Sequence, residues 1–178
     1  MAHTTGARSG RRPSADELAT WRAFIETSDQ LRTVLGTRLR EDSGLSEGDY
    51  AVLLALSEAE GRRLRSSVLA ARIGWQRSRL SHHLGRMERR GLVDRQECAE
   101  DSRGAEVVAT AEGLSAFRRA TVPHLHAVRE LFLDALSPEQ LDAVAGIVAA
   151  LRDRLPPRPP VSGAAAAGEA VRDGRRSG

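Results

Sequence analysis

Apolar residues recur at three- and four-residue steps between positions 14 and 155, which is the period of amphipathic helices. Residues with capping chemistry mark several boundaries. Ser46 with Asp49 three positions later is a start signal, and Ser137 precedes a proline suited to a first helical turn. These patterns predict longer helices over four segments: Asp16–Arg40, Ser46 to about Ser57, Thr110 to about Ala135, and Ser137 to about Leu155.

The centre of the chain predicts shorter elements. An extended piece, Arg62–Arg65, leads into a short helix, Val68–Ile73. Ser66 or Ser67 is the expected N-cap of that helix, because a serine hydroxyl can accept a bond from a free amide of the first turn. Gly74 is expected to end the helix, since glycine readily adopts the left-handed conformation found there.

A second helix, Gln76–Arg90, is predicted after this turn, and it is strongly amphipathic. Leu80, Leu84 and Met87 fall on one side, while serine, histidine and arginine occupy the other. A helix, a turn containing glycine and a second helix with a free basic face form the helix-turn-helix pattern. In that pattern the second helix enters the DNA major groove.

Two strands, Leu92–Cys98 and Ala105–Ala109, are predicted next, with the polar segment Ala99–Gly104 as a hairpin loop. The expected fold class is therefore mainly α with a small β-hairpin wing (α+β): a winged helix-turn-helix lobe plus a helical dimerisation domain. The expected domains are a disordered tail at 1–13, a helical dimerisation domain made of 14–45 and 110–155, a winged helix-turn-helix DNA-binding domain at 46–109, and a disordered tail at 156–178.

The first long helix and the last two carry apolar stripes that need a partner surface. Two interlocking chains would bury these stripes, so a homodimer is expected. A two-fold protein also suits two DNA half-sites about 34 Å apart, one helical turn. The apolar residues of the last two helices are Leu114, Phe117, Leu125, Val128, Leu131, Phe132, Val144, Ile147, Val148 and Leu151.

The net charge of +3 conceals an uneven distribution along the chain. Residues 62–103 carry 11 arginines against 5 acidic residues, whereas the rest of 14–155 carries 9 arginines and 17 acidic residues. A basic block in an otherwise acidic domain is typical of a surface that binds a polyanion, although an ordinary solvated surface is the alternative. Because the block coincides with the helix-turn-helix and the hairpin, double-stranded DNA is the expected partner.

The free side of the Gln76–Arg90 helix offers donors that base edges require, and arginine with guanine is the most common specific pair. A solvated helix surface is the alternative for each arginine. The candidate DNA-binding residues on this helix and beside it are Ser66, Ser67, Arg77, Ser78, Arg79, Ser81, His82, Arg86 and Arg95.

The hairpin tip adds Asp101, Ser102 and Arg103 as candidate DNA contacts. An arginine at the end of a projecting loop suits a narrow minor groove, and the acid two residues earlier can hold its guanidinium. The alternative is an aspartate that stabilises the turn beside an arginine without a role.

Two stretches of the sequence resemble the MarR family of bacterial regulators: LAARIGWQRSRLSHHLGRMERRGLV and AEDSRGAEVVATAEG. The resemblance covers about Ser14–Leu155. It implies an obligate homodimer whose first and last two helices interlock and whose winged lobes bind a pseudo-palindromic operator. It also implies a transcriptional regulator, most often a repressor, that is commonly released by a small-molecule effector bound where the lobe meets the dimerisation domain. The effector and its binding residues are unknown.

Two places in the sequence, three residues in all, differ from the family pattern or lie where it varies. Gly85 in mid-helix costs about 1 kcal/mol relative to alanine, so a close approach to the DNA backbone or tolerance by packing would explain it. His82 and His83 stand where relatives vary, so the operator sequence of another member does not transfer to this chain.

Other classes of function have little support in the sequence. His124 and His126 are two residues apart on a helix and face different ways, so no metal site and no cofactor are expected. Cys98 is interpreted as a small structural side chain, with a redox trigger as the alternative. The chain has no phosphate loop, nucleophile elbow or metal quartet, so it is not expected to be an enzyme. A low-specificity architectural DNA-binding protein is the alternative function. No long apolar run or signal sequence is present, so we expect a cytoplasmic, nucleoid-associated protein without a membrane partner.

Overall fold

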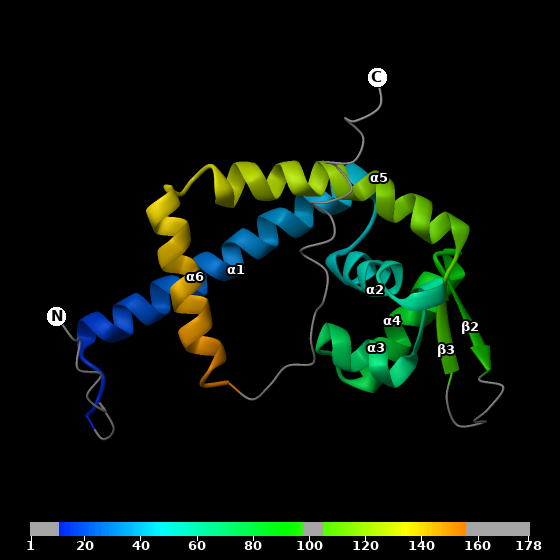
Figure 1. The fold of residues 1–178 in the computed structure, drawn as a ribbon, viewed down its shortest axis with the longest axis horizontal. Helices are drawn as coiled ribbons and strands as arrows, with labels where there is room; N and C mark the ends of the chain where they lie inside the picture. Colours follow the sequence, from blue (N-terminus) through cyan, green and yellow to red (C-terminus); the bar gives the residue numbers. More distant parts are fainter. Residues whose placement is uncertain (1–10, 98–104, 156–178) are drawn as a thin grey trace.

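The structure is a computed structural model that describes residues 11–97 and 105–155. Helices dominate, and a small antiparallel sheet lies beside α3 and α4 at one end of the molecule (Figure 1). The expected class, mainly α with a small β-hairpin wing, is confirmed. The elements in chain order are α1 (Ala15–Ser43), α2 (Glu47–Ser57), η1 (Glu60–Arg62), β1 (Arg63–Arg65), α3 (Ser66–Ile73), α4 (Arg77–Arg89), β2 (Val93–Glu97), β3 (Ala105–Ala109), α5 (Ala111–Val128), η2 (Arg129–Leu133) and α6 (Pro138–Arg152).

Side-chain caps fix where the long helices begin. Ser14, Ser46 and Ser137 form capping boxes at the starts of α1, α2 and α6, and the Thr110 hydroxyl caps α5. The helix starts predicted at Ser46, Thr110 and Ser137 are therefore confirmed. The end of α1 is set by Gly44, whose φ of 70° breaks the helix in the left-handed conformation.

The helix predicted to run to about Ala135 changes character before it ends. Regular α-helical bonding stops at Val128, and the chain continues as the π-helical turn η2. There the Asp134 amide donates to the Arg129 carbonyl, five residues back. Apolar spacing alone does not distinguish an α turn from a π turn, which is why the sequence predicted one uniform helix.

The sheet has three strands, where the sequence predicted two. β1 pairs antiparallel with β3, with Arg63 opposite Val108, and β3 pairs with β2, with Val93 opposite Ala109. The resulting strand order is β1-β3-β2. A strand as short as β1, paired with a segment distant in sequence, leaves no local signal beyond its extended backbone.

A serine N-cap for α3 was expected, and this expectation is wrong. The helix begins at Ser66 itself, with Arg65 in the N-cap position and no side-chain cap. The Ser66 hydroxyl instead donates to the Ala105 carbonyl oxygen at 2.8 Å. The serine thus connects the start of α3 to the neighbouring strand β3.

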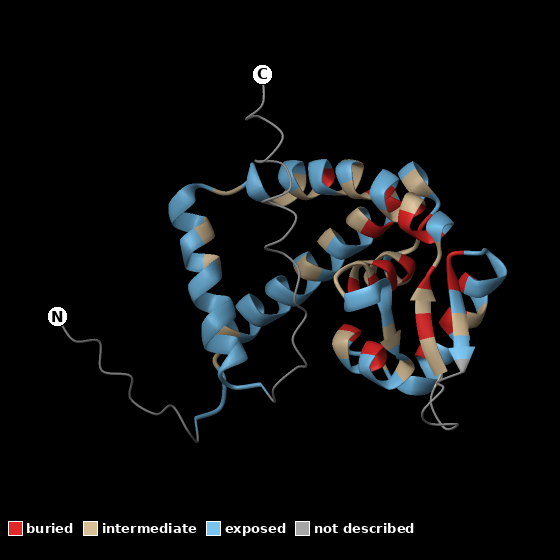
Figure 2. Ribbon diagram, turned by 45° about the vertical axis from the view of Figure 1, so that its right-hand side comes forward, coloured by how far each residue is buried: buried red, intermediate tan, exposed pale blue. Residues whose placement is uncertain are grey.

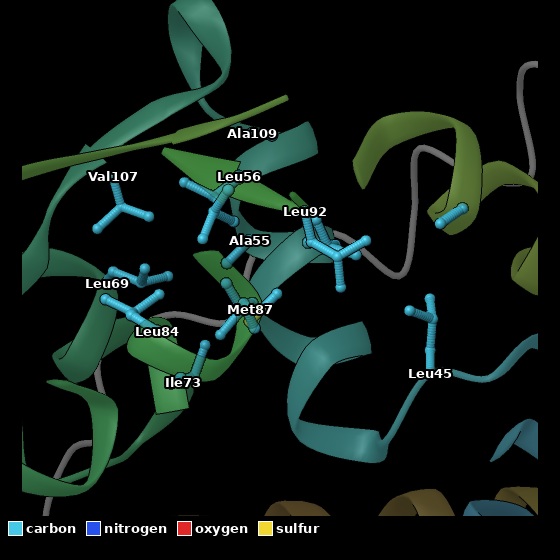
Figure 3. Close-up of a cluster of buried hydrophobic side chains, with 14 of the residues drawn as sticks. Leu45, Ala55, Leu56, Leu69, Ile73, Leu84, Met87, Leu92, Val107 and Ala109 are labelled. Atoms are coloured by element: carbon cyan, nitrogen blue, oxygen red, sulfur yellow. The ribbon is translucent and has the colours of Figure 1, made fainter. Parts of the chain in front are cut away.

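The apolar core is centred on the lobe formed by α2, α3, α4 and the sheet, and it continues to the end of α1 at Leu39 and to the start of α5 at Leu114. Figure 3 shows side chains from these elements converging, among them Leu56, Leu69 and Met87, each fully buried. The start of α5 packs closely against this lobe, because a Cβ added at Gly113 would overlap the Leu92 carbonyl oxygen. The core therefore holds α4 rigidly by one face.

Outside the lobe, α1 and α5 lie side by side (Figure 1), and an ion pair of 2.7 Å joins Arg38 of α1 to Glu130 of η2. Figure 2 shows that α6 and the N-terminal half of α1 are exposed along their length. Their exposed residues include large apolar side chains: Trp21 is 60% exposed and Ile147 is 52% exposed. These helices have apolar faces that the single chain leaves uncovered.

Candidate nucleic-acid interface

The helix-turn-helix predicted from the helices Val68–Ile73 and Gln76–Arg90 is present as α3, a tight turn and α4. Gly74 ends α3 with a φ of 72°, and the Trp75 amide donates to the Ala70 carbonyl, which closes the turn. On α4, the buried side consists of Leu80, Leu84 and Met87 together with His83. The core therefore fixes which side of α4 faces outward.

The outward side of α4 carries the predicted base-contacting residues. All of them are exposed: Arg77, Ser78, Arg79, Ser81, His82 and Arg86. At 100° per residue, Ser78 and His82 lie opposite the buried side, while the arginines flank this central strip. The structure thus places them together on one surface, while their contact with DNA stays a prediction.

Two of these arginines are held by aromatic rings at the flank of α4 nearest α2. The Arg79 guanidinium carbon lies 4.2 Å from the centre of the Trp75 ring, a cation–π contact. The Arg86 Nη2 atom lies 2.9 Å from Nδ1 of His83. The two rings touch edge to face, with centroids 5.1 Å apart. We refer to Trp75 and His83 as the ring pair.

Arg95 packs beside Gly85, the unusual glycine of α4. Its side chain extends from β2 across α4, where Nη2 donates to the Ser81 carbonyl at 3.0 Å and Nε lies 3.5 Å from Glu88. A Cβ added at Gly85 would lie 3.3 Å from Arg95 Nη2. Arg95 therefore packs closely over Gly85, and the close approach of the DNA backbone to this glycine stays a prediction. The prediction that Arg95 also contacts DNA stays untested.

The remaining predicted contacts fall into two groups. Ser66 is half-buried and bonded to Ala105, whereas Ser67 is exposed on the first turn of α3. The candidates at the wing tip, Asp101, Ser102 and Arg103, lie outside the described residues. Cys98 lies outside them as well.

Asp49 connects the start of α2 to the end of α4, a contact that the sequence did not predict. Its carboxylate is buried, accepts from the Ser46 amide at 2.9 Å, and accepts from Arg90 Nη1 at 2.7 Å. Arg90 also donates to the Gly44 carbonyl at 2.8 Å. The capping role of Asp49 was readable from its spacing to Ser46, but its pairing with the end of α4 had no local signal.

The charge state of Asp49 follows from these contacts. Burial alone would raise its pKa, but the contacts with His83, with the Ser46 amide and with Arg90 outweigh burial and hold the pKa far below its usual range. Asp49 is therefore ionised at neutral pH, and it anchors the end of α4 to the start of α2.

His124 and His126 have different surroundings, as their spacing predicted. The His124 ring packs against Tyr50, with centroids 4.8 Å apart, and burial lowers its pKa, while His126 is exposed. In 11–97 and 105–155, no three His, Cys, Asp or Glu side chains gather in a way that could hold a metal ion. Within the same ranges, no helix is long and apolar enough to cross a membrane.

Comparisons with known proteins agree with this geometry. Residues 43–104 match the model of the MarR family. A curated relative, the HTH-type transcriptional repressor YetL of Bacillus subtilis, is 28% identical over 112 residues, which are 63% of this chain and 66% of YetL, just under two thirds of its length.

Two solved structures from Streptomyces coelicolor are more similar over a larger share of the chain. Sco3205, a MarR family regulator solved in complex with DNA, is 36% identical with a TM-score of 0.78, covering 84% of this chain and 94% of Sco3205. AbsC is 35% identical with a TM-score of 0.74, covering 81% of this chain and 97% of AbsC. On this evidence the chain belongs to the MarR family of transcriptional regulators, which are DNA-binding proteins and not enzymes.

Proposed function

We propose that this regulator is a homodimeric repressor that binds a pseudo-palindromic operator by inserting α4 into the major groove. The observation that carries the proposal is the division of α4 into a buried apolar side and an exposed side of arginine, serine and histidine. The major groove is about 12 Å wide and admits one helix, and these side chains include the donors that read base edges. The DNA complex of Sco3205 supports this use of the fold.

The uncovered apolar faces of α1, α5 and α6 support the dimer. Their exposed large side chains gather on helices that lie outside the winged lobe: Leu18, Trp21, Phe24, Val122, Leu125, Ile147, Val148 and Leu151. Exposed apolar area of this extent is typical of an interaction surface. We therefore assign dimerisation to 14–45 and 110–155, and DNA binding to 46–109. Two lobes related by a two-fold axis would meet half-sites one helical turn apart.

A repressor would act by occupying a promoter and excluding polymerase. YetL is named a transcriptional repressor, which supports repression as the effect on transcription. The basic surface of the lobe supports tight binding to DNA. Binding to chromosomal DNA would place the protein on the nucleoid.

An open cavity beside the ring pair supports release by a small molecule. Its volume is about 640 Å³, within the range of ligand pockets. Its lining is rich in arginine, contains both members of the ring pair, and includes Arg32, Glu47, Trp75, Arg79, His83 and Arg86. An anionic effector bound there would compete with DNA for Arg79 and Arg86.

Selection of bound sequences from a random duplex pool tests the proposal, followed by a salt titration of the selected duplex against scrambled DNA. We expect a palindrome with half-sites one turn apart, bound about 10³-fold more tightly than scrambled DNA. Light scattering should give the mass of two chains. A pool that stays random, with binding lost as salt alone increases, would instead establish the low-specificity architectural protein.

A further inference from the structure

The buried side of α4 contains one polar residue among three apolar ones, and that residue is His83. Its ring is held from two directions. Trp75 meets it edge to face, and the first turn of α2 approaches so closely that a Cβ added at Gly48 would lie 2.8 Å from His83 Cε1 and 2.7 Å from Trp75 Cη2. The orientation of the imidazole is therefore fixed by packing before any DNA binds.

The two ring nitrogens of His83 face different partners. Nδ1 lies 2.9 Å from Arg86 Nη2. Nε2 is buried, makes no aligned hydrogen bond, and lies 3.0 Å from Asp49 Oδ1, an ion-pair distance. A guanidinium only donates, so Nδ1 must be the acceptor of the contact with Arg86. The imidazole proton then resides on Nε2, the nitrogen that lies beside the carboxylate.

Asp49 is well placed to keep the proton on Nε2. Its Oδ2 atom accepts from the Ser46 amide and from Arg90, which leaves Oδ1 directed at His83. An ionised carboxylate beside Nε2 stabilises the tautomer that has its proton there. The same tautomer exposes the Nδ1 lone pair to Arg86.

Arg86 lies at the edge of the DNA-facing strip, where a long side chain has many rotamers. Its guanidinium has five N–H donors, and His83 accepts from one of them, so the others stay available for a base or a phosphate. A side chain that is ordered before binding loses less conformational freedom when the complex forms.

Resting on the DNA-binding function proposed above, we propose that His83 is a positioning residue for operator recognition: Asp49 fixes its tautomer, and its Nδ1 atom holds Arg86 in the orientation that reads the operator. His83 is buried and touches no DNA itself. Arg77, on the opposite flank of α4, is an exposed arginine outside this arrangement and serves as a matched control.

Two amide substitutions separate the roles of the ring nitrogens. The asparagine oxygen of His83→Asn can occupy the place of Nδ1, whereas the amide of His83→Gln extends toward the place of Nε2. We expect His83→Gln to weaken binding of the selected duplex about tenfold, the size of one specific arginine contact, and His83→Asn to stay within about twofold of wild type.

The decisive measurement is a double-mutant cycle on that duplex, by fluorescence anisotropy at fixed salt. His83→Gln should cost about tenfold in wild type and in Arg77→Ala, but less than about twofold in Arg86→Ala. Equal losses in all three backgrounds would show that His83 acts only through the fold, and no loss in wild type would show that it does not act on DNA binding. Either result overturns the proposal. If no duplex is selected, the proposed function itself is wrong. If a duplex is selected but Arg86→Ala leaves selectivity unchanged, Arg86 does not read the operator, and this proposal fails while the proposed function stands.

Nitrogen NMR shifts of the wild-type imidazole test the same arrangement without a substitution. At neutral pH the His83 proton should be on Nε2 alone. A proton on Nδ1, with or without one on Nε2, is incompatible with acceptance from Arg86 and overturns the proposal even if the operator is found.

Discussion

The winged lobe and the helices outside it bury apolar side chains to very different extents. In the lobe, Leu53, Leu56 and Met87 are fully buried. On α1 and α6, Trp21 is 60% exposed and Leu151 is 45% exposed. Burying one large apolar side chain contributes about 1.5–3 kcal/mol, so the outer helices leave a substantial stabilisation unused in the single chain.

This difference assigns separate tasks to the two regions. The core of the lobe is completed within the single chain, with the end of α1 and the start of α5 contributing, and the exposed side of the lobe is polar and basic, suited to a charged ligand. The outer helices expose side chains that only another apolar surface can cover, and a second copy of the same chain offers one. The stability change caused by a substitution in the lobe should therefore be independent of protein concentration. The change caused by a substitution in the outer helices should depend on protein concentration.

Leu56→Ala should have the largest effect. The residue is fully buried, and removing a leucine side chain from a well-packed core costs about 3 kcal/mol. Urea unfolding should show this loss at every protein concentration. Val68, an exposed residue of the same lobe, is the control, and Val68→Ala should change stability by less than about 0.5 kcal/mol. If the loss caused by Leu56→Ala grew on dilution, the core around Leu56 would not be complete within a single chain.

Ile147→Asp should break the proposed dimer while sparing the lobe. A charge in an apolar interface is expected to raise the dissociation constant about 100-fold, or about 2.7 kcal/mol. Sedimentation should show single chains at concentrations where wild type is paired, and the palindromic duplex should bind weakly. Ala149 lies about 200° away around α6, so Ala149→Asp should leave the mass unchanged. Wild-type chains that sediment singly would refute the dimer.

Asp49→Asn should destabilise the lobe by about 2 kcal/mol at neutral pH, because bonds to a charged group are lost. The folded state lowers the pKa of Asp49, so its stabilisation is complete above the unfolded pKa of about 3.9 and declines as the pH falls below it. Urea unfolding from pH 7 to pH 3 should show wild type and variant converging. Asp94→Asn, at an exposed carboxylate, should show no such trend. A constant gap would mean that Asp49 acts without its charge.

Local chemistry made most of the fold readable from the sequence. Capping pairs such as Ser46 with Asp49, and breakers such as Gly74, act within a few residues of their own positions. Contacts between distant segments were not readable. β1 is a strand only because it pairs with β3. The prediction of Ser66 as an N-cap was wrong because its hydroxyl bonds to a strand that comes much later in the chain.

The site shows the same limit in more detail. The exposed arginines of α4 could be predicted because the helix period places them outside the apolar stripe that contains Leu80 and Met87. The same period puts His83 on the buried side, a signal that the sequence carried but that only the position of Asp49 makes interpretable. Gly85 stood out as unusual, yet the side chain that packs beside it, Arg95, comes from another element of the fold.

The smallest effects should come from the DNA contacts, which alter binding and leave mass and stability unchanged. Arg86→Ala should weaken the selected duplex about tenfold and relax the preference at particular base pairs. Arg103→Ala, outside the described residues, should weaken every duplex by a similar factor of about five and lower the salt slope by about 1. Competition binding on single-base variants of the selected duplex, repeated at several salt concentrations, measures both.

These two substitutions distinguish recognition of the base sequence from electrostatic attraction to DNA within one lobe. An arginine that contacts base edges discriminates between sequences, whereas one placed in a narrow minor groove responds mainly to width and potential. Equal losses from both changes across random DNA would mean that α4 contributes charge alone. The polar variety of its exposed side, with Ser78 and His82 among the arginines, would then have no function in recognition.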